Sequence, residues 1–515
     1  WRRDAETQRF IINVLCASVP LCPHAFTSAL TTMHFTVIQR VTGILLMLFS
    51  IVLVPPMLID LWYAEGASSV FFISYLSTLL TGIVLWLPVR HIKTELRLRD
   101  GFVVVVMFWT LGSAMGALPL YLYSPLNMPL VDAVFESVSA ITTTGATVMS
   151  GLDSMPHAIL YHRSQLHFLG GMGIIVLAVA ILPMLGIGGM QLYKAEAPGP
   201  VKDSKLTPRI TETAKALWYV YLTLNIACIL SFWLAGMPLF DAVNHAFSAL
   251  SLGGFSTHDA SIGHYNNPAI EAVTVVFMFL GGVNFALHFI AFRRISVKPF
   301  THDVEFRAYF MLLFSMALIC VMFLYFSGTA SGEHALRSGI FHAVSIMTTT
   351  GLLTLDGYSS WPGFLAVMLV FSSFIGACAG STGGGMKVIR VLLLIKQWGR
   401  EMLRLIHPSA QVVVKINKSP VSEDIMNAVW GFASAYVTVI AILMLLLMAS
   451  GLDQVTAFSA VAACLNNMGA GLGDVSSTFG NLNDFAKWVL SFAMLLGRLE
   501  VFTLLVLLMP AFWRK

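Results

Sequence analysis

The sequence has 515 residues, of which 57% are hydrophobic and only 11% are charged, and its formal net charge is +4. Soluble domains carry about 25% charged residues, so this composition excludes an ordinary soluble protein and makes lipid the main solvent of the chain. The six cysteines are scattered without paired spacing, which argues against a disulfide framework and against a cysteine metal site.

The first 32 residues differ from the rest of the chain. They show no regular helical period, and Pro20 and Pro23 interrupt their apolar stretch. We expect residues 1–32 to be an N-terminal extension that adds nothing to the core fold, and Met33 to begin the first membrane segment.

A series of apolar runs follows, most of them long enough to cross about 30 Å of hydrocarbon as a helix. They cover residues 36–62, 70–90, 101–123, 213–236, 304–328, 361–376, 425–450 and 484–512, with less regular spans near 165–188 and 270–292. The pattern predicts an all-α membrane protein.

Basic residues gather in alternate connections between these runs. Residues 90–99, 194–215, 293–307 and 387–418 hold most of the Lys and Arg, and the positive-inside rule makes their side cytoplasmic. The other side is rich in acids, which would concentrate cations at an outer mouth. These acids are Asp132, Glu136, Asp153, Asp241, Asp259, Glu271, Glu333, Asp356, Asp453, Asp474, Asp484 and Glu500.

A short motif occurs four times between apolar runs. The copies are FESVSAITTTGAT (135–147), NHAFSALSLGGFS (244–256), FHAVSIMTTTGLL (341–353) and SAVAACLNNMGAG (459–471). Each copy is too short to span a bilayer, so we interpret it as a re-entrant half-helix followed by a loop. Non-helical backbone survives at membrane depth only where it is buried or lines water. The alternative is four helix–helix turns at the surface.

Four such loops around one axis predict a ring of carbonyl groups that could replace the hydration shell of a cation. The shared glycine suits a backbone that needs φ > 0 or a close approach. The predicted filter residues are Thr142, Thr143, Thr144, Gly145, Ser251, Leu252, Gly253, Gly254, Thr348, Thr349, Thr350, Gly351, Asn466, Asn467, Met468 and Gly469.

A second shared glycine follows each motif, at Gly170, Gly281, Gly376 and Gly497. The next residue is small in three copies and is Arg498 in the fourth. An arginine at membrane depth usually faces an aqueous cavity or a partner. We expect Arg498 at the pore wall below the filter; the alternative is a local pair with Glu500.

The third copy also carries a glycine-rich stretch where its second helix should run. Glycine costs about 1 kcal/mol against alanine in a helix, so we predict an intramembrane loop that acts as a gate. The alternative is a close-packing glycine face. The predicted gate residues are Gly376, Gly380, Ser381, Thr382, Gly383, Gly384 and Gly385.

Two smaller groups of polar residues have simpler interpretations. Asp132 and Asp241 stand near the starts of the first and second half-helices, where an acid stabilises a helix N-terminus. The isolated histidines, such as His245, His342 and His288, are interpreted as packed or solvated rather than as metal ligands.

These motifs, with FLGGMG, AGSTGGGMK and GRLEVFTLLVLLMPAFWR, resemble the Trk/Ktr/HKT superfamily of potassium transporters and are most similar to its bacterial TrkH-type subunits. The resemblance covers nearly all of the chain from Met33. It implies two extra helices ahead of four helix–pore loop–helix units around a pseudo-fourfold pore. The implied divisions are an extension (1–32), the two extra helices (33–95), and pore units 1 (96–195), 2 (196–298), 3 (299–405) and 4 (406–515).

The resemblance also implies a function and partners. The filter would bind K⁺ as the transported ion, with no organic cofactor, and Na⁺ is a second candidate ion. The third-unit loop would gate, and Arg498 would line the pore. A homodimer in the bacterial inner membrane is implied, with the filter mouth facing the periplasm and a TrkA-like nucleotide-binding ring docked on the cytoplasmic face.

A symporter and an intramembrane enzyme are the two other function classes to consider for this sequence. A symporter coupled to H⁺ or Na⁺ is the alternative within transport, and carboxylates at the midplane of spanning helices would favour it. An intramembrane enzyme would need a paired Asp, a Ser/His set or an HExxH motif, and the chain has none of these patterns, so we expect no enzymatic activity.

Overall fold

The computed structural model describes residues 34–91, 98–176, 210–355, 357–417 and 419–513. The predicted N-terminal extension, residues 1–32, and Asp356 lie outside this part of the chain. Within it, the regular structure is helical apart from one two-residue pairing of Lys415–Ile416 with Ser419–Pro420. The all-α prediction is confirmed. Six of the described helices are long and apolar enough to cross a membrane, or up to eight if each bent pair is one span.

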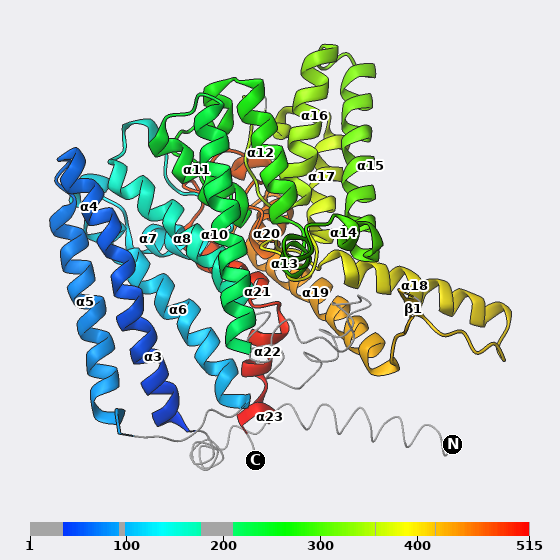
Figure 1. Ribbon diagram of the computed structural model, residues 1–515, viewed down its shortest axis with the longest axis horizontal. Coiled ribbons are helices and arrows are strands. Elements are labelled where there is room, and N and C mark those ends of the chain that lie inside the picture. Colours follow the sequence, from blue (N-terminus) through cyan, green and yellow to red (C-terminus); the bar gives the residue numbers. More distant parts are fainter. Residues whose placement is uncertain (1–33, 92–97, 177–209, 356, 418, 514–515) are drawn as a thin grey trace.

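The first membrane helices form a group on one side of the molecule (Figure 1). Helix α3 (Phe35–Ser50) continues through a 3-10 turn into α4 (Val54–Tyr63), and α5 (Ser68–Trp86) returns beside α3. The side chain of Asp60 accepts hydrogen bonds from the N–H groups of Ala67 and Ser68 at 2.9 and 2.6 Å, which fixes the turn between α4 and α5.

The rest of the chain repeats one helical pattern. Each unit has a first helix, a short pore helix and a second helix, which we number units 1 to 4. The first helices are α6 (Leu98–Leu122), α10 (Ile210–Leu234), α15 (Val304–Phe326) and α19 (Glu423–Ala449). The pore helices are α7 (Leu130–Ile141), α11 (Leu239–Ser251), α16 (Gly332–Met347) and α20 (Gln454–Leu465). The second helices begin with α8 (His157–Val176), α12 (Pro268–Gly281), α17 (Gly363–Ile375) and α21 (Asp484–Arg498).

The four units close into a ring in chain order. Each pore helix packs against the first helix of its own unit: α6 on α7, α10 on α11, α15 on α16 and α19 on α20. Each second helix packs on the pore helix of the next unit: α8 on α11, α12 on α16, α17 on α20, and α21 back on α7. The four short helices therefore surround one centre. The residue boundaries between units that the sequence suggested stay predictions.

The second helices break close to the shared glycine. Helix α12 turns by 98° into α13 (Phe285–Arg294), which α14 (Lys298–His302) follows, and α21 turns by 115° into α22 (Phe502–Leu508), which α23 (Pro510–Trp513) follows. In unit 3, α17 ends at Ile375 and twelve residues separate it from the start of α18 (Val388–Ile406). An interruption of the second helix was predicted for unit 3 alone, but the second helices of units 2 and 4 also bend.

Helices α3 and α5 pack through a glycine contact that leaves no room for a side chain. A Cβ added to Gly82 would lie 2.9 Å from the carbonyl oxygen of Gly43, and one added to Gly43 would lie 2.8 Å from that of Gly82. Small residues allow such close backbone approach between membrane helices.

We therefore expect Gly82→Leu to push α3 and α5 apart and to destabilise the protein by about 1–3 kcal/mol, the usual cost of overpacking. The measurement is the midpoint of thermal unfolding in detergent. Gly399→Leu on α18 is the matched control, because a Cβ there meets nothing within 4 Å. Equal midpoints for the two variants would contradict the packing argument.

Candidate functional site

The loops after the pore helices share one backbone conformation. Thr143, Leu252, Thr349 and Asn467 all have positive φ, at 51°, 56°, 63° and 54°. Two residues later, Gly145, Gly254, Gly351 and Gly469 have φ of 81°, 87°, 79° and 79°. Positive φ in residues with side chains is costly and persists only where the surroundings impose it, typically at functional sites. The fourfold recurrence shows that the filter segments predicted from sequence have equivalent backbones.

Each of the four glycines lies against the backbone of the next unit. A Cβ on Gly145 would stand 2.1 Å from the carbonyl oxygen of Gly253, and one on Gly254 would stand 2.2 Å from that of Thr350. The same contact joins Gly351 to the carbonyl oxygen of Met468 at 1.9 Å, and Gly469 to that of Thr144 at 2.3 Å, which closes the circle. The structure thus brings the four predicted filter segments together around one axis and excludes four separate surface turns.

Polar side chains of the filter hold the loops in place. The hydroxyls of Thr142 and Thr144 lie 2.8 Å apart, and those of Thr348 and Thr350 repeat this pair at 2.8 Å. The Asn467 amide donates to the Thr144 hydroxyl at 2.9 Å and so joins unit 4 to unit 1. These four hydroxyls and the Asn467 amide nitrogen are therefore engaged in hydrogen bonds within and between the loops. Gly145, Gly254 and Gly351 are only half-buried among buried neighbours, so the ring keeps contact with solvent.

Behind the ring, the residue nine positions before the glycine ties the pore helix to the extended segment that follows the glycine. In unit 1 this residue is Glu136, which accepts from the N–H of Val148 at 2.9 Å. In unit 2 His245 contacts the Ser256 hydroxyl at 3.0 Å, and in unit 3 His342 accepts from the N–H of Thr354 at 3.5 Å. His245 and His342 were expected to be either packed or solvated, and the structure shows that both are packed in the interior.

Unit 4 has Ala460 at this position and uses the neighbouring residue instead. The Ser459 hydroxyl donates to the carbonyl of Leu472 at 2.9 Å and accepts from its N–H at 3.0 Å. The sequence reading missed this shared role, although the position could be found from the register of the four motifs.

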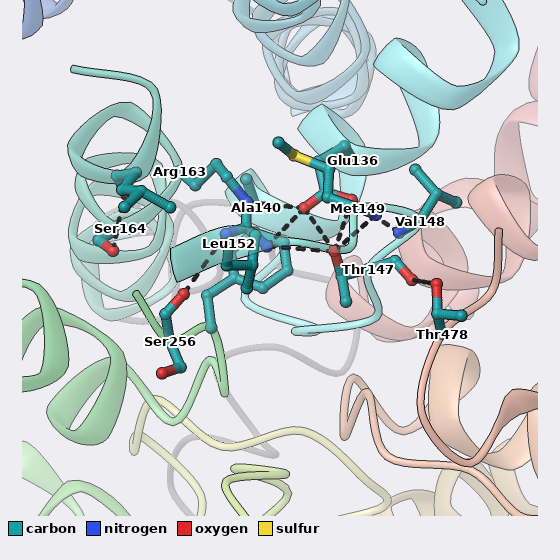
Figure 2. A network of polar contacts seen from close by, with 12 residues as sticks. Glu136, Ala140, Thr147, Val148, Met149, Leu152, Arg163, Ser164, Ser256 and Thr478 are labelled. Carbon is teal, nitrogen blue, oxygen red and sulfur yellow. Dashed lines mark hydrogen bonds and ion pairs between the residues drawn. The ribbon is translucent and has the colours of Figure 1, made fainter. Parts of the chain in front are cut away.

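Unit 1 contains a buried ion pair at this place (Figure 2). Glu136 and Arg163 meet at 2.7 Å with side chains 0% and 1% exposed. The Thr147 hydroxyl donates to Glu136 at 3.0 Å, and Arg163 reaches the Ser256 carbonyl of unit 2 at 3.4 Å. The guanidinium also lies 4.1 Å over the ring of Phe255. Glu136 was predicted to be one of the acids that concentrate cations at an outer mouth. It is instead a buried residue whose ion pair joins α7 to α8.

Other charges that the sequence assigned to the outer side are also paired. Lys487 of α21 meets Asp132 of α7 at 2.6 Å, and Arg337 of α16 meets Glu271 of α12 at 2.8 Å. Asp132 therefore bridges units 4 and 1, and α7 has no side-chain hydrogen bond at its N-cap. Asp132 lies in the first turn of α7, as predicted, and it has this ion pair in addition. Because these acids are paired, this face is less negative than the sequence suggested.

The glycine-rich loop of unit 3 runs directly beneath the ring. The Thr382 hydroxyl donates to the carbonyl of Leu250 at 2.9 Å, at the end of the unit 2 pore helix. The N–H of Gly384 donates to the Thr349 hydroxyl in the filter of unit 3 at 2.7 Å. A Cβ on Gly384 would lie 1.9 Å from the carbonyl oxygen of Asn466 in unit 4. The loop thus contacts three filter segments at once, and these contacts exclude a plain helix-packing face.

The loop is fixed at both ends by one carboxylate. Glu305, buried in the first turn of α15, accepts from the N–H of Ala379 at 2.7 Å and from the N–H of Ile389 at 3.2 Å. Lys387 donates from its Nζ to the Gly383 carbonyl. Sequence analysis gave no role to Glu305, since a single acid near a helix start carries no signal of a partner 74 residues away.

Arg498 holds this loop from the opposite side. It is 2% exposed, and its guanidinium donates to the carbonyl of Thr382 in the loop at 3.0 Å and to the carbonyl of Gly170 in unit 1 at 2.7 Å. Glu500, the alternative partner, pairs with Arg390 of α18 at 2.6 Å instead. Arg498 therefore lies just below the ring and links unit 4, the loop and unit 1.

Comparison with known proteins identifies relatives over most of the chain. Residues 67–515 match the model of the family TrkH, described as cation transport protein. The chain is 54% identical over 486 residues to "Trk system potassium uptake protein TrkH" of Vibrio parahaemolyticus, covering 94% of this chain and 100% of that protein. It is 50% identical over 484 residues to the protein of the same name from Escherichia coli strain K12, with 94% and 100% covered.

A solved structure shows the same similarity. The "Crystal Structure of the Potassium Transporter TrkH from Vibrio parahaemolyticus" superposes with a TM-score of 0.87 at 51% identity, covering 94% of this chain and 100% of the other.

Removing one partner of the Glu136–Arg163 pair should strongly destabilise the protein. A buried pair that loses one member leaves an uncompensated charge, which typically costs about 3–5 kcal/mol. We expect Arg163→Ala to lower the thermal unfolding midpoint in detergent well below that of Glu401→Gln. The control removes a carboxylate from a partly exposed pair, in which the side chains of Glu401 and Arg404 are 45% and 38% exposed. Surface pairs of this kind are worth about 0–1 kcal/mol. Similar midpoints for both variants would show that the Glu136–Arg163 pair does not stabilise the fold.

Proposed function

The chain belongs to the TrkH family of cation transport proteins, and we propose that it takes up potassium across a membrane through the ring of its four filter segments. The observation that carries this proposal is the closed circle of glycine-to-carbonyl contacts at Gly145, Gly254, Gly351 and Gly469. The names of the relatives from Vibrio parahaemolyticus and Escherichia coli, both potassium uptake proteins, support the choice of ion.

The ring would act by replacing water around the ion. Backbone carbonyls from the four loops offer oxygen ligands that can substitute for a hydration shell. The pore helices end at the ring, and their C-terminal ends carry partial negative charge, which favours a cation there. The same chemistry admits Na⁺, which we keep as a second ion.

The loop from Gly376 to Gly385 would gate the pathway. It lies beneath the ring, contacts the filter segments of units 2, 3 and 4, and is bound by Arg498. A buried guanidinium here places a positive charge in the path of a cation leaving the filter, and desolvated charges interact strongly. The closed state would therefore combine a backbone plug with electrostatic repulsion.

Regulation would act through α18. This helix starts directly after the loop and projects away from the helical bundle (Figure 1). We propose that a TrkA-like nucleotide-binding ring docks on this face and moves α18, which would draw the loop from the pathway. A homodimer in the bacterial inner membrane, with the filter mouth toward the periplasm, completes the proposal, and the basic residues of α18 support a cytoplasmic position for this face.

The symport alternative has less support. Coupling to H⁺ would call for a carboxylate free to exchange protons within the membrane. Among the buried carboxylates of the described residues, Glu136 and Glu271 pair with arginines. Asp60, Asp303 and Glu305 accept hydrogen bonds from backbone N–H groups.

Purified protein in liposomes should take up K⁺, and Gly254→Ala should abolish most of that flux. The added Cβ would stand 2.2 Å from the Thr350 carbonyl, at a φ of 87°. Strain of about 1–3 kcal/mol is expected from φ alone, so we predict a fall in flux of at least about tenfold. Gly363→Ala is the control, because a Cβ there meets nothing within 4 Å. No cation flux from the unaltered protein, with or without a nucleotide-binding partner, would refute the proposal.

Freeing the loop should raise basal flux. Arg498→Ala removes both the bond to Thr382 and the positive charge, and deletion of 381–384 removes the plug itself. Each hydrogen bond from a charged group is worth about 1.5–3 kcal/mol, so a several-fold rise is expected without the partner. Arg404→Ala on the outer part of α18 is the control for loss of an arginine. Unchanged flux in both loop variants would remove the gating role.

A further inference from the structure

A cluster of metal-ligating side chains lies outside the filter, where the outer loops of units 1 and 2 meet. Asp153 belongs to the loop after the filter of unit 1, and His258 and His264 belong to the loop after the filter of unit 2. One ligand atom from each of the three lies within 4.8 Å of those from the other two, and no other such group occurs in the described part of the chain. The 105-residue separation hid this cluster from sequence analysis.

Two imidazoles converge on one carboxylate oxygen. The Nδ1 atoms of His258 and His264 lie 2.5 and 3.8 Å from Oδ1 of Asp153. The two rings stack with their centroids 3.6 Å apart and their planes 2° from parallel. Ligands of a tetrahedral zinc ion, at bonds of about 2.0–2.1 Å, stand roughly 3.3 Å apart, so the observed distances bracket that spacing.

A second carboxylate, that of Asp241, lies on the far side of the His258 ring from Asp153. In metal sites a carboxylate usually occupies this position and supports the histidine ligand. Nε2 of His258 is buried without a hydrogen bond among the described residues, and it stands 3.5 Å from Oδ2 of Asp241. Asp241 is itself held by the Thr257 hydroxyl at 2.8 Å. Metal-bound histidines almost always donate their other N–H to a carboxylate, which orients the ring and raises its basicity.

The loops that carry the ligands are fixed to each other. Asp259 of unit 2 accepts from the N–H groups of Gly151 and Leu152 in unit 1 at 2.9 and 3.1 Å. The hydrogen bond from His258 lowers the pKa of the Asp153 carboxyl, which keeps it ionised at neutral pH. The side chains of Asp153 and His264 are 52% and 45% exposed, so an ion from solution can reach them.

We propose that Asp153, His258 and His264 form a site for a divalent transition metal, with Zn²⁺ as the best fit, that bridges units 1 and 2 on the filter-mouth side. Two imidazoles and one carboxylate suit Zn²⁺ better than Mg²⁺ or Ca²⁺, which prefer oxygen ligands. The fourth position faces solvent and would hold water. A bound ion would join two loops that begin a few residues beyond the filter glycines Gly145 and Gly254.

Isothermal titration calorimetry with ZnCl₂ tests this site, on full-length protein purified in detergent without a polyhistidine tag. We expect one Zn²⁺ per chain, and an affinity at least about tenfold lower in His264→Ala, since loss of a ligand costs at least as much as loss of its supporting partner. His264→Ala removes a partly exposed ring and should fold normally. His407→Ala, an exposed histidine at the end of α18, is the matched control and should bind as the unaltered protein does.

Cobalt provides a second readout that does not depend on transport. Co²⁺ in a site with two imidazoles and a carboxylate gives visible d–d absorption, which should be lost in Asp153→Asn and retained in His407→Ala. Binding should also weaken as the pH is lowered, because protons compete with the metal ion for the imidazoles. No stoichiometric Zn²⁺ binding, or binding that both His264→Ala and Asp153→Asn leave unchanged, would overturn the proposal. Because these are binding measurements, they stand apart from the test of potassium uptake.

Discussion

The absence of a side chain at four ring positions is the constraint on which the rest of the structure depends. Gly145, Gly254, Gly351 and Gly469 each let the carbonyl of the next unit approach to a distance that a Cβ could not tolerate. Each glycine also takes a φ that residues with side chains rarely adopt. The ring therefore closes only if all four units present the same backbone, and the packing of each second helix on the next pore helix serves that closure.

Around this common backbone the four units use different chemistry. The segment after each ring glycine is held by a buried ion pair in unit 1, by histidines in units 2 and 3, and by the Ser459 hydroxyl in unit 4. The second helices differ in the same way, since α12 and α21 bend while unit 3 replaces the bend with a loop. Equivalent geometry is thus maintained by unrelated contacts, which leaves each unit free to acquire a role of its own.

Much of this arrangement could be predicted from sequence because its signals are local. Apolar length gave the spanning helices, and the register of four short motifs gave the ring and the place of Arg498. Contacts between residues far apart in the chain could not be predicted in this way. Nothing near Glu305 indicates that it binds the backbone of Ala379, and Glu136 looks like any outer acid until Arg163 is placed beside it. The bends after Gly281 and Arg498 were missed because no run of glycines marks them.

The single arginine beneath the ring has a consequence for how such a pore can be built. In an assembly of four identical subunits, any residue at this level would occur four times. Four guanidinium groups around one narrow axis would repel each other at low dielectric, and each would need its own carbonyl acceptors. Joining four units in one polypeptide lets the chain place one arginine there, held by Thr382 and Gly170. Covalent continuity thus lets a charged residue occur once beneath the ring, whereas four identical subunits would place it there four times.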